Sequence, residues 1–171
     1  MKVYTNSTIF TETILSRTVV LPITMIGNRT EDNLRAVLVA KYEGKCIDDG
    51  YIKPNTIRVV TYSAGIAESD TGVFYVTFSC MLCKPVMGMH VECYAKSIHK
   101  GGVRAELNEN SSLDKTTPLM IFLARDHHYH STNQLNDIVT NAKIEVEIMG
   151  VRYELNDPYI GVIAKYVRTI S

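Results

Sequence analysis

Five strand-like segments follow Pro85, and they constrain the fold of this chain more than any other feature. Each is rich in β-branched and apolar residues, and turn residues separate them. They span 86–100, 102–107, 118–125, 143–155 and 159–168. Between the third and the fourth lies a polar stretch with at most a short helical turn, near 133–139. Five strands interrupted in this way predict a small, all-β closed barrel of the OB type.

The residues before Pro85 mix strands with one helix. Strand-like segments rich in Ile, Val, Leu, Thr and aromatic residues span 8–22, 57–66 and 73–83. The first is expected to break near Ser16. A polar turn joins the second to the third, so we expect these two to form an antiparallel hairpin.

A helix is expected between the first two of these strands. Thr30 is followed by Glu31 and Asp32, which suits an N-cap and the first turn of a helix. Apolar residues then recur at helical spacing until Gly44, which ends the element. Strand, helix and hairpin predict a small α+β unit. We therefore expect two domains, 1–82 and 83–171, with a shared interface.

The charge balance argues against one class of function. The chain has 171 residues, with 18 Lys and Arg against 18 Asp and Glu, and so no formal net charge at pH 7. The balance also holds in each part, with 8 against 8 up to Ser79 and 10 against 10 after it. A protein that holds DNA alone neutralises many phosphates and needs a basic surplus. Contact with nucleic acid is therefore expected to be local and weak.

The sequence also bears on the compartment. No apolar run approaches the ~20 residues that span a bilayer. The first residues are polar and do not resemble a secretory signal. We therefore expect an intracellular, reducing environment and no membrane partner.

Four cysteines raise the question of a metal or redox site. Cys80 and Cys83 have the two-residue gap of such sites, but neither Cys46 nor Cys93 completes a second pair. Side chains alternate along a strand, so Cys80 and Cys83 are expected on opposite faces. Buried thiols are the favoured interpretation, with a metal site as the alternative.

The order of five short motifs resembles a known family. The motifs are Tyr-Glu-Gly-Lys-Cys at 42–46, Asp-Gly-Tyr-Ile at 49–52, Gly-Val-Phe-Tyr-Val-Thr-Phe at 72–78, Lys-Pro-Val-Met-Gly at 84–88 and Lys-Gly-Gly-Val at 100–103. Together they resemble the stalk subunit of multisubunit DNA-directed RNA polymerases, called subunit seven in eukaryotes and E-prime in archaea. The resemblance covers about 8–168.

This resemblance implies different roles for the two domains. In the family, an N-terminal tip domain docks on the polymerase core, between the largest subunit and a small assembly subunit. The C-terminal OB domain, similar to that of polynucleotide phosphorylase, points at emerging RNA. A second stalk subunit is a further candidate partner.

The sequence departs from the family pattern in its second half. Segment 102–107 lacks an aromatic ring, the loop at 108–117 matches poorly, and the run Arg-Asp-His-His at 125–128 is unusual. These departures argue against strong stacking on RNA. They indicate a divergent copy such as those of large cytoplasmic DNA viruses, which would place it in the virion and host cytoplasm. A cellular copy would be nuclear.

The resemblance places a docking segment at Gly50, Tyr51, Ile52 and Lys53. A tyrosine and an isoleucine projecting from a turn can fill pockets on a partner at low entropic cost. Replacing both is then expected to release the subunit and leave its own fold intact. The alternative interpretation is an ordinary turn with a half-buried tyrosine.

Six residues are candidates for contact with RNA. Alternation places Tyr94 and Lys96 on one face of their strand with His90 and Glu92, while Val91, Cys93 and Ala95 face the core. A tyrosine ring can stack on a base, and cationic side chains can reach phosphates. The candidates are Tyr94, Lys96, Arg104, Arg125, His127 and His128. The alternative is a solvated face, since Glu92 and Glu106 interleave with the basic residues.

No catalytic motif is present in the sequence. Nucleophile elbows, phosphate-binding loops, dinucleotide fingerprints and zinc-hydrolase helices are absent. We therefore expect no enzyme activity of its own, no cofactor and no metal. The favoured function is a non-catalytic polymerase subunit that contacts or guides nascent single-stranded RNA. The alternatives are a free-standing RNA-binding OB protein and a small hydrolase at the histidine cluster of His127, His128 and His130.

Overall fold

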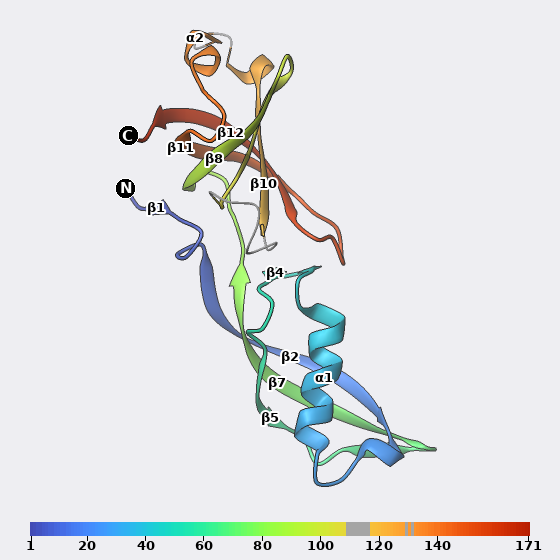
Figure 1. The fold of residues 1–171 in the computed structure, drawn as a ribbon. Helices are drawn as coiled ribbons and strands as arrows, with labels where there is room; N and C mark the ends of the chain where they lie inside the picture. The colour runs from blue at the N-terminus through green and yellow to red at the C-terminus, as the bar shows by residue number, and fades with distance from the viewer. Residues whose placement is uncertain (109–116, 129, 131) are drawn as a thin grey trace.

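The computed structural model describes residues 1–108, 117–128, 130 and 132–171. The chain forms two β-sheets at the two ends of an elongated molecule (Figure 1). Both chain termini lie beside the sheet that contains the C-terminal strands (Figure 1).

The first sheet is organised around two long antiparallel strands, β2 (Phe10–Pro22) and β7 (Thr71–Cys83). They pair without a register shift along their whole length. The break predicted near Ser16 is therefore absent, and the hydroxyl of this residue lies 3.0 Å from that of Thr77 on β7. The remaining strands of the sheet are β3 (Cys46–Ile47), β4 (Gly50–Ile52), β5 (Arg58–Tyr62) and β6 (Ile66–Glu68).

Strand β7 is the centre of this sheet. Along its second edge it pairs with β4, β5 and β6, and β4 in turn pairs with β3. The predicted hairpin arm at 57–66 is thus divided into β5 and β6. The division falls at Gly65, which has φ +83°, and a Cβ there would lie 2.8 Å from the Phe74 ring.

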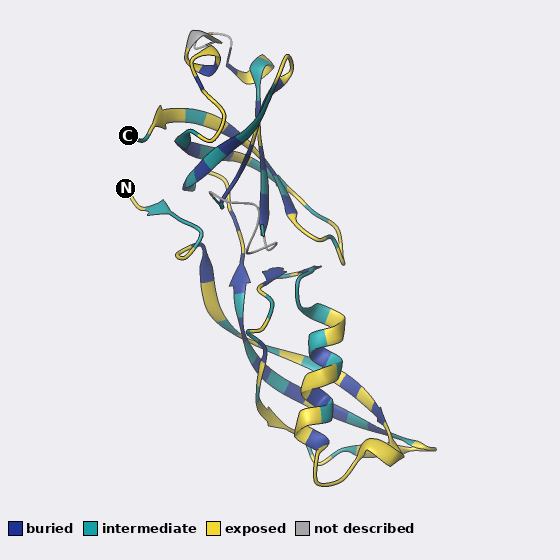
Figure 2. Cartoon of the chain, in the orientation of Figure 1, coloured by how far each residue is buried: buried dark blue, intermediate teal, exposed yellow. Residues whose placement is uncertain are grey.

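Helix α1 (Thr30–Tyr42) lies across one face of the first sheet (Figure 1). A 3₁₀ turn, η1 (Ile23–Met25), leads to it from β2. Arg29, not Thr30, is the N-cap, because the Thr30 hydroxyl bonds back to the backbone of Gly27 instead. Leu34 and Leu38 are fully buried and form the apolar stripe that faces the sheet (Figure 2).

The second sheet closes into a barrel of five strands. These are β8 (His90–His99), β9 (Gly102–Glu106), β10 (Leu119–Ala124), β11 (Lys143–Arg152) and β12 (Ile160–Thr169). Around the barrel the order is β8, β9, β10, β12, β11 and back to β8. The β10–β12 pair is parallel and the other four pairs are antiparallel. The predicted closed barrel of five strands is confirmed.

Shorter elements complete the barrel. The 3₁₀ turn η2 (Arg125–His127) and helix α2 (Thr132–Asn136) lie between β10 and β11, where the polar stretch predicts a helical turn. The N-terminal strand β1 (Val3–Tyr4) pairs in parallel with β8. The predicted strand at 86–100 begins only at His90, because a turn containing Gly88 at φ +86° precedes it.

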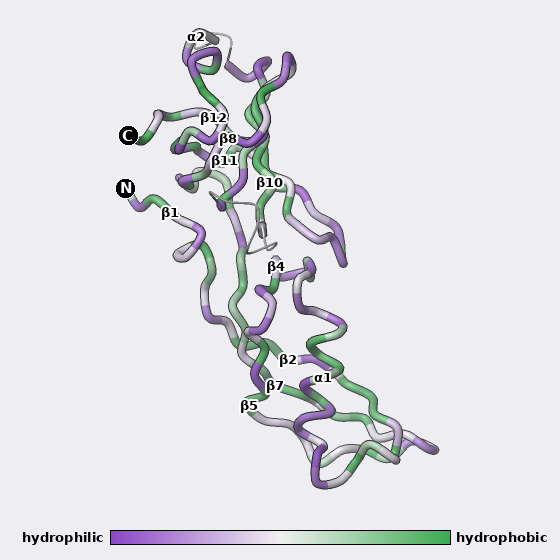
Figure 3. Tube along the Cα trace, viewed as in Figure 1, coloured by the Kyte–Doolittle hydropathy of each residue, from purple (hydrophilic) through white to green (hydrophobic). Residues whose placement is uncertain are grey.

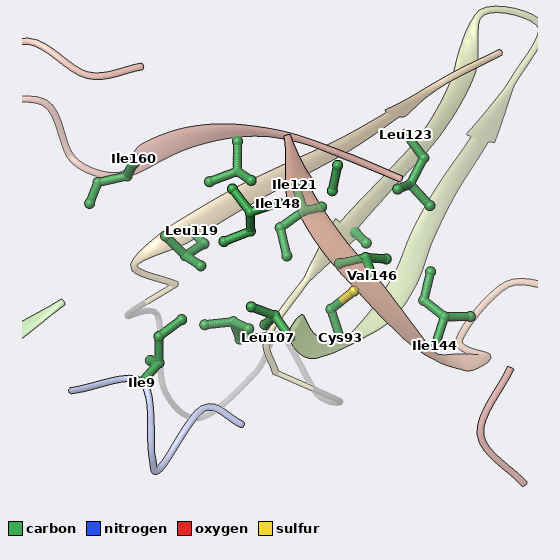
Figure 4. Close-up of a cluster of buried hydrophobic side chains, with 14 of the residues drawn as sticks. Ile9, Cys93, Leu107, Leu119, Ile121, Leu123, Ile144, Val146, Ile148 and Ile160 are labelled. Atoms are coloured by element: carbon green, nitrogen blue, oxygen red, sulfur yellow. The ribbon is translucent and has the colours of Figure 1, made fainter. Parts of the chain in front are cut away.

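The barrel interior is filled by aliphatic side chains from all five strands. Figure 4 shows this core in close-up, and its labelled residues include Ile121, Val146 and Ile148. Gly102, at the start of β9, allows the tight closure of β9 on β10, because a Cβ there would lie 2.2 Å from the carbonyl oxygen of Leu123.

The two sheets meet close to the predicted domain boundary. The backbone of Cys46 bonds to the loop between β11 and β12, through Asp157 at 2.8 Å and Asn156 at 2.9 Å. The Tyr153 hydroxyl donates to the carbonyl oxygen of Asp48 at 3.1 Å. Residues of the first part also enter the core of the barrel. These are Ile9, Phe10, Cys46 and Tyr51, and they pack there with Cys83, the last residue of β7.

Tyr51 lies at this junction, and its substitution tests how much the junction contributes to stability. Its side chain is 3% exposed, and its ring centre lies 6.5 Å from that of Phe10. We expect Tyr51→Ala to lower the free energy of unfolding by about 3–5 kcal/mol, because truncating a buried aromatic ring leaves a cavity. Tyr51→Phe keeps the ring and should cost far less. Urea unfolding followed by circular dichroism measures both. An alanine variant as stable as the wild type would show that Tyr51 does not join the two parts.

A buried ionic cluster joins three barrel strands. The Glu145 carboxylate on β11 lies 2.9 Å from His90 Nδ1 on β8 and 2.6 Å from Arg168 Nε on β12. Glu145 is 5% exposed and His90 is 8% exposed. The hydrogen bond from Arg168, followed by that to His90, holds the pKa of Glu145 below its usual value.

This lowered pKa predicts an acid-sensitive contribution to stability. Because the pKa of Glu145 is lower in the folded chain, its contribution is present above the unfolded value of about 4.3. It is lost as the pH falls further through the folded value. We expect Glu145→Gln to destabilise the chain at pH 7 and to differ less from the wild type at about pH 3. Glu154→Gln, at an exposed loop position, is the control. An equal difference at both pH values would contradict this assignment.

Candidate nucleic-acid interface

The outer face of the barrel carries an exposed aromatic ring beside an arginine. Phe122 on β10 lies directly opposite Arg104 on β9 and beside Ile163 on β12. Phe122 is 40% exposed and Ile163 is 45% exposed, while the residues that flank Phe122 in sequence point into the core. Next to Ile163 on β11 is Gly150, which has no side chain to stand above this surface. Four neighbouring strands thus form one shallow, mainly apolar row.

A second row runs beside the first. It begins at Tyr94 on β8 and continues through Glu106 on β9 and Met120 on β10. It ends at Gly161 on β12 and Arg152 on β11. We call the two rows together the outer barrel face. An exposed ring combined with arginines on the same face is an arrangement by which OB barrels stack bases and reach phosphates.

Three of the predicted RNA-binding residues lie on or next to this face. Arg104 contacts Glu106 at 2.8 Å with about half of its side chain exposed. The Lys96 ammonium lies 5.9 Å above the ring of Tyr94. Strand β8 has a bulge between Ala95 and Ser97, so Lys96 leaves the regular alternation.

The residues that alternation places on one face of β8 are not all exposed and unpaired. His90 is buried in the ionic cluster with Glu145 and is not part of the surface. Glu92 pairs with Lys143 on β11 at 2.9 Å. The positive charge near Tyr94 is therefore partly neutralised by carboxylates, as the interleaved sequence suggests.

A hollow of about 340 Å³ lies between the barrel and the N-terminal turn. Its lining includes Tyr94 and Lys143 from the barrel, Lys53 from the end of β4, and the hydroxyl residues Thr5 and Ser7. Lys53 and Tyr94 were predicted for different roles, in docking and in RNA contact. The structure places them at one hollow, which combines hydroxyl and ammonium groups with the Glu92 carboxylate that pairs with Lys143.

The predicted docking segment requires a correction. Tyr51 and Ile52 do not project from a turn, because β4 pairs with β7 and buries them to 3% and 0% exposure. Gly50 is also buried, at φ +140°, and a Cβ there would lie 2.3 Å from the carbonyl oxygen of Cys83. Lys53 is the exposed member of the four. The expectation that both side chains fill pockets on a partner, and that their removal spares the fold, is wrong.

His128 also requires a correction. It is 2% exposed, its Nδ1 lies 2.6 Å from the carbonyl oxygen of Ala124, and its Nε2 accepts the N–H of Tyr166 at 2.9 Å. These contacts define a neutral ring protonated at Nδ1, which fastens the turn after β10 to β12. The ring is not available to stack on a base.

The other members of this group differ in accessibility. Arg125 donates from Nη1 to Asn136 Oδ1 at 2.9 Å, so its guanidinium joins η2 to α2. His127 and His130 are exposed, and Tyr129 lies outside the described residues. Of the predicted residues near α2, His127 is therefore exposed enough to contact a ligand.

Sequence reasoning missed Phe122, Ile163 and Arg152. Phe122 lies in a run of five apolar residues, 119–123, where alternation does not reveal which face is outside. The outward direction of Phe122 follows from the pairing of β10 with β9. Arg104 is polar and must face outward, so its cross-strand neighbour must as well.

The cysteines behave as buried thiols. Cys80 belongs to the core under α1 and Cys83 to the core of the barrel, so the prediction that they face opposite ways is confirmed. Burial raises the pKa of Cys80 to about 11 and that of Cys83 to about 12. Among the described residues, His, Cys, Asp and Glu do not gather in threes that could hold a metal ion. No helix in the described part of the chain is long and apolar enough to cross a membrane.

Comparison with known proteins relates this chain to a viral protein. No family model matches this chain. The chain is 28% identical over 158 residues to a protein of Acanthamoeba polyphaga mimivirus named "Putative DNA-directed RNA polymerase subunit L376". The aligned region covers 85% of this chain and 75% of the mimivirus protein.

The outer barrel face predicts which substitutions weaken binding to single-stranded RNA. Phe122→Ala should weaken it by about 5- to 150-fold, which corresponds to the 1–3 kcal/mol of one stacked base. Arg104→Ala should weaken it and reduce the salt dependence by about one phosphate contact. Fluorescence anisotropy with a labelled oligouridine at several salt concentrations measures both effects. Tyr75→Ala, which removes an exposed ring from the other sheet, is the control. Equal losses from Tyr75→Ala and Phe122→Ala would exclude the face as the binding site.

Proposed function

We propose that this chain is a non-catalytic subunit of a viral DNA-directed RNA polymerase. The observation that carries the proposal is the similarity to the mimivirus protein, which extends over both sheets and covers most of each chain. The ordered motifs that resemble the polymerase stalk subunit support the same function from an independent comparison. In such a complex, nucleotide addition belongs to other chains.

The proposal assigns a different role to each part of the molecule. The part built on the first sheet, 1–82, docks on the polymerase core as the tip domain. The part 83–171 is an OB-type domain, which is supported by the barrel order β8, β9, β10, β12, β11, with a parallel β10–β12 pair and a helix after β10. The boundary is supported by the two separate hydrophobic clusters, although Ile9, Phe10, Cys46 and Tyr51 pack with the barrel.

The barrel guides nascent single-stranded RNA in this proposal. The exposed Phe122 ring and the nearby cations Arg104, Lys96 and Arg152 support it, because stacking and charge suit RNA of any sequence. The balanced charge keeps the contact weak, so the transcript can move past the subunit.

The partners follow from the resemblance. They are the largest polymerase subunit and the small assembly subunit of the core, together with a second stalk subunit. Lys53 remains a candidate docking contact because it is exposed at the junction of the two parts. A viral polymerase subunit would be found in the virion and in the host cytoplasm.

A free-standing RNA-binding protein is the second candidate function. The outer barrel face favours it equally, since stacking and charge serve an isolated OB protein as well. The first sheet and its helix distinguish the two functions, because RNA binding by a barrel does not require them. A hydrolase at the histidine cluster is disfavoured, since both ring nitrogens of His128 are bonded within the chain.

Affinity purification from the native source tests the proposal. A tagged chain should co-purify with the two large polymerase subunits in constant proportion at moderate salt. The purified complex should synthesise RNA, and the isolated chain should neither synthesise nor cleave it. Recovery of the chain with RNA and without polymerase subunits would refute the proposal in favour of the free-standing protein.

A further inference from the structure

Strand β2 has one free edge. Among the described residues it pairs with β7 alone, so the opposite edge of this thirteen-residue strand meets no other strand. A row of unpaired N–H and C=O groups on a long edge is a template for a further strand. Globular proteins usually shorten or protect such edges.

The hydrogen-bonding direction of each residue on β2 follows from the ladder. Ile23, the next residue after β2, donates its N–H to the carbonyl oxygen of Asp70, which continues the β2–β7 register by one step. Antiparallel residues alternate between pairs that exchange bonds and pairs that do not. Odd-numbered residues of β2 therefore bond to β7. The even-numbered residues Ile14, Ser16, Thr18 and Val20 direct their N–H and C=O groups to the free edge.

The bonding on the other side of β7 agrees with this assignment. Lys53 donates its N–H to the carbonyl oxygen of Met81, and Ser63 donates to that of Tyr75. Odd-numbered residues of β7 thus bond toward β4 and β5. Its even-numbered residues are left to bond with β2, as the register requires.

The free edge lacks the usual protection against another strand. The ladder has no bulge, the strand contains no lysine, and its proline stands at the last position. Its one cation, Arg17, is held by Asp49 at 2.9 Å and lies over the ring of Tyr42. From Thr13 to Pro22 the strand therefore offers an edge with no unpaired charge.

The sheet face beside this edge is open, and the side chains that β2 and β7 place on it between Ile14 and Val20 are uncharged. The side chains of Ile14 and Val20 are 65% and 52% exposed, and Tyr75 on β7 is 59% exposed. Ser16 and Thr18 lie between them, opposite Thr77 and Tyr75. Figure 3 shows hydrophobic stretches along β2 and β7, and Figure 2 shows exposed residues alternating with residues of intermediate or full burial along β2. Helix α1 covers only the opposite face.

A hollow of about 440 Å³ adjoins the other end of the edge. Thr11 and Thr13 of β2 line it together with Ile9, Leu82 and Met89. A strand laid along β2 would direct alternate side chains to the open face and toward this hollow. Apolar side chains of Ile9, Leu82, Val86 and Met89 line it beside Asp49 and Lys84, and its volume admits a large aliphatic or aromatic side chain.

We propose that the free edge of β2 binds an extended strand from another subunit of the polymerase. The strand bonds to the backbone of residues 14–20, carries uncharged side chains along this stretch and places one large apolar side chain in the hollow. This mode of recognition is β-strand addition, in which backbone bonds give affinity and pockets give specificity. The inference rests on the proposed function for the source of the strand.

A second copy of this chain fits the edge less well. If two β2 strands paired antiparallel, the strand end at Thr11 and Thr13 would meet the other copy near Val19 and Leu21. These residues are 3% and 0% exposed under α1 of their own copy. They are therefore not available to fill the hollow, and the isolated chain should be monomeric.

Proline substitution tests the edge without breaking the sheet. Thr18→Pro removes an N–H that faces the free edge, and proline is tolerated on edge strands in this position. We expect it to abolish co-purification with the polymerase, while Thr18→Ala, which keeps the N–H, co-purifies like the wild type. Both variants should unfold within a few degrees of each other. Co-purification of Thr18→Pro in wild-type amounts would overturn the inference.

A second variant covers the case in which the proline variant does not fold. Thr18→Lys places a charge on the open face beside the edge and should also release the subunit. Ala36→Lys, at an exposed position of α1, is the matched control and should remain bound. Retention of Thr18→Lys at wild-type level would count against strand addition.

Hydrogen exchange identifies the groups involved. The amides of Ser16 and Thr18 should exchange rapidly in the isolated chain and at least tenfold more slowly in the polymerase, whereas those of odd-numbered residues are protected in both. Unchanged exchange at the even-numbered residues would overturn the inference.

Light scattering of the isolated chain tests self-pairing. A dimer that Thr18→Pro dissociates would overturn the inference in favour of a second copy of this chain. If the wild type itself does not co-purify with polymerase subunits, the proposed function fails; if it does and Thr18→Pro also does, only the edge inference fails.

Discussion

Strand β7 is the element on which both parts of the structure depend. It pairs along one edge with β2 and along the other with β4, β5 and β6. Every strand of the first sheet except β3 is therefore hydrogen-bonded directly to β7. Its alternating side chains also reach two cores. Phe78 and Cys80 are buried under α1, while Cys83, three residues further, packs with the barrel. A single continuous strand therefore fixes the position of the first sheet against the second.

The burial of the segment around Tyr51 follows from the same arrangement. Strand β4 pairs with the last residues of β7, which brings Tyr51 against the barrel and leaves Lys53 at the surface. The residues that resemble a docking motif thus form the joint within the chain. Surfaces available to partners lie elsewhere, on the outer barrel face and along the free edge of β2. These two surfaces are at opposite parts of the molecule, so the proposed RNA and protein ligands would not compete for one surface.

The chemistry of the two surfaces differs in a way that suits different ligands. The outer barrel face combines an exposed ring with arginines and lysines, and its affinity for a polyanion must fall as salt rises. From Thr13 to Pro22 the β2 edge has no unpaired charge and offers backbone groups and apolar side chains, so salt has little effect on its interactions. The neutral composition of the chain conceals this separation, because cations and carboxylates balance overall while they are distributed unevenly over the surface.

The sequence by itself determined the types of the longer elements, the number of barrel strands, the opposite faces of Cys80 and Cys83, and the balanced charge that argues against strong binding of nucleic acid. These properties depend on local periodicity and composition, which are independent of neighbouring elements. Only the tertiary structure decided that Phe122 faces outward, that Tyr51 and His128 are buried, and that β2 keeps a free edge. Periodicity states which residues share a face, but burial depends on which element covers that face, and strand pairing is set by contacts between distant segments of the chain.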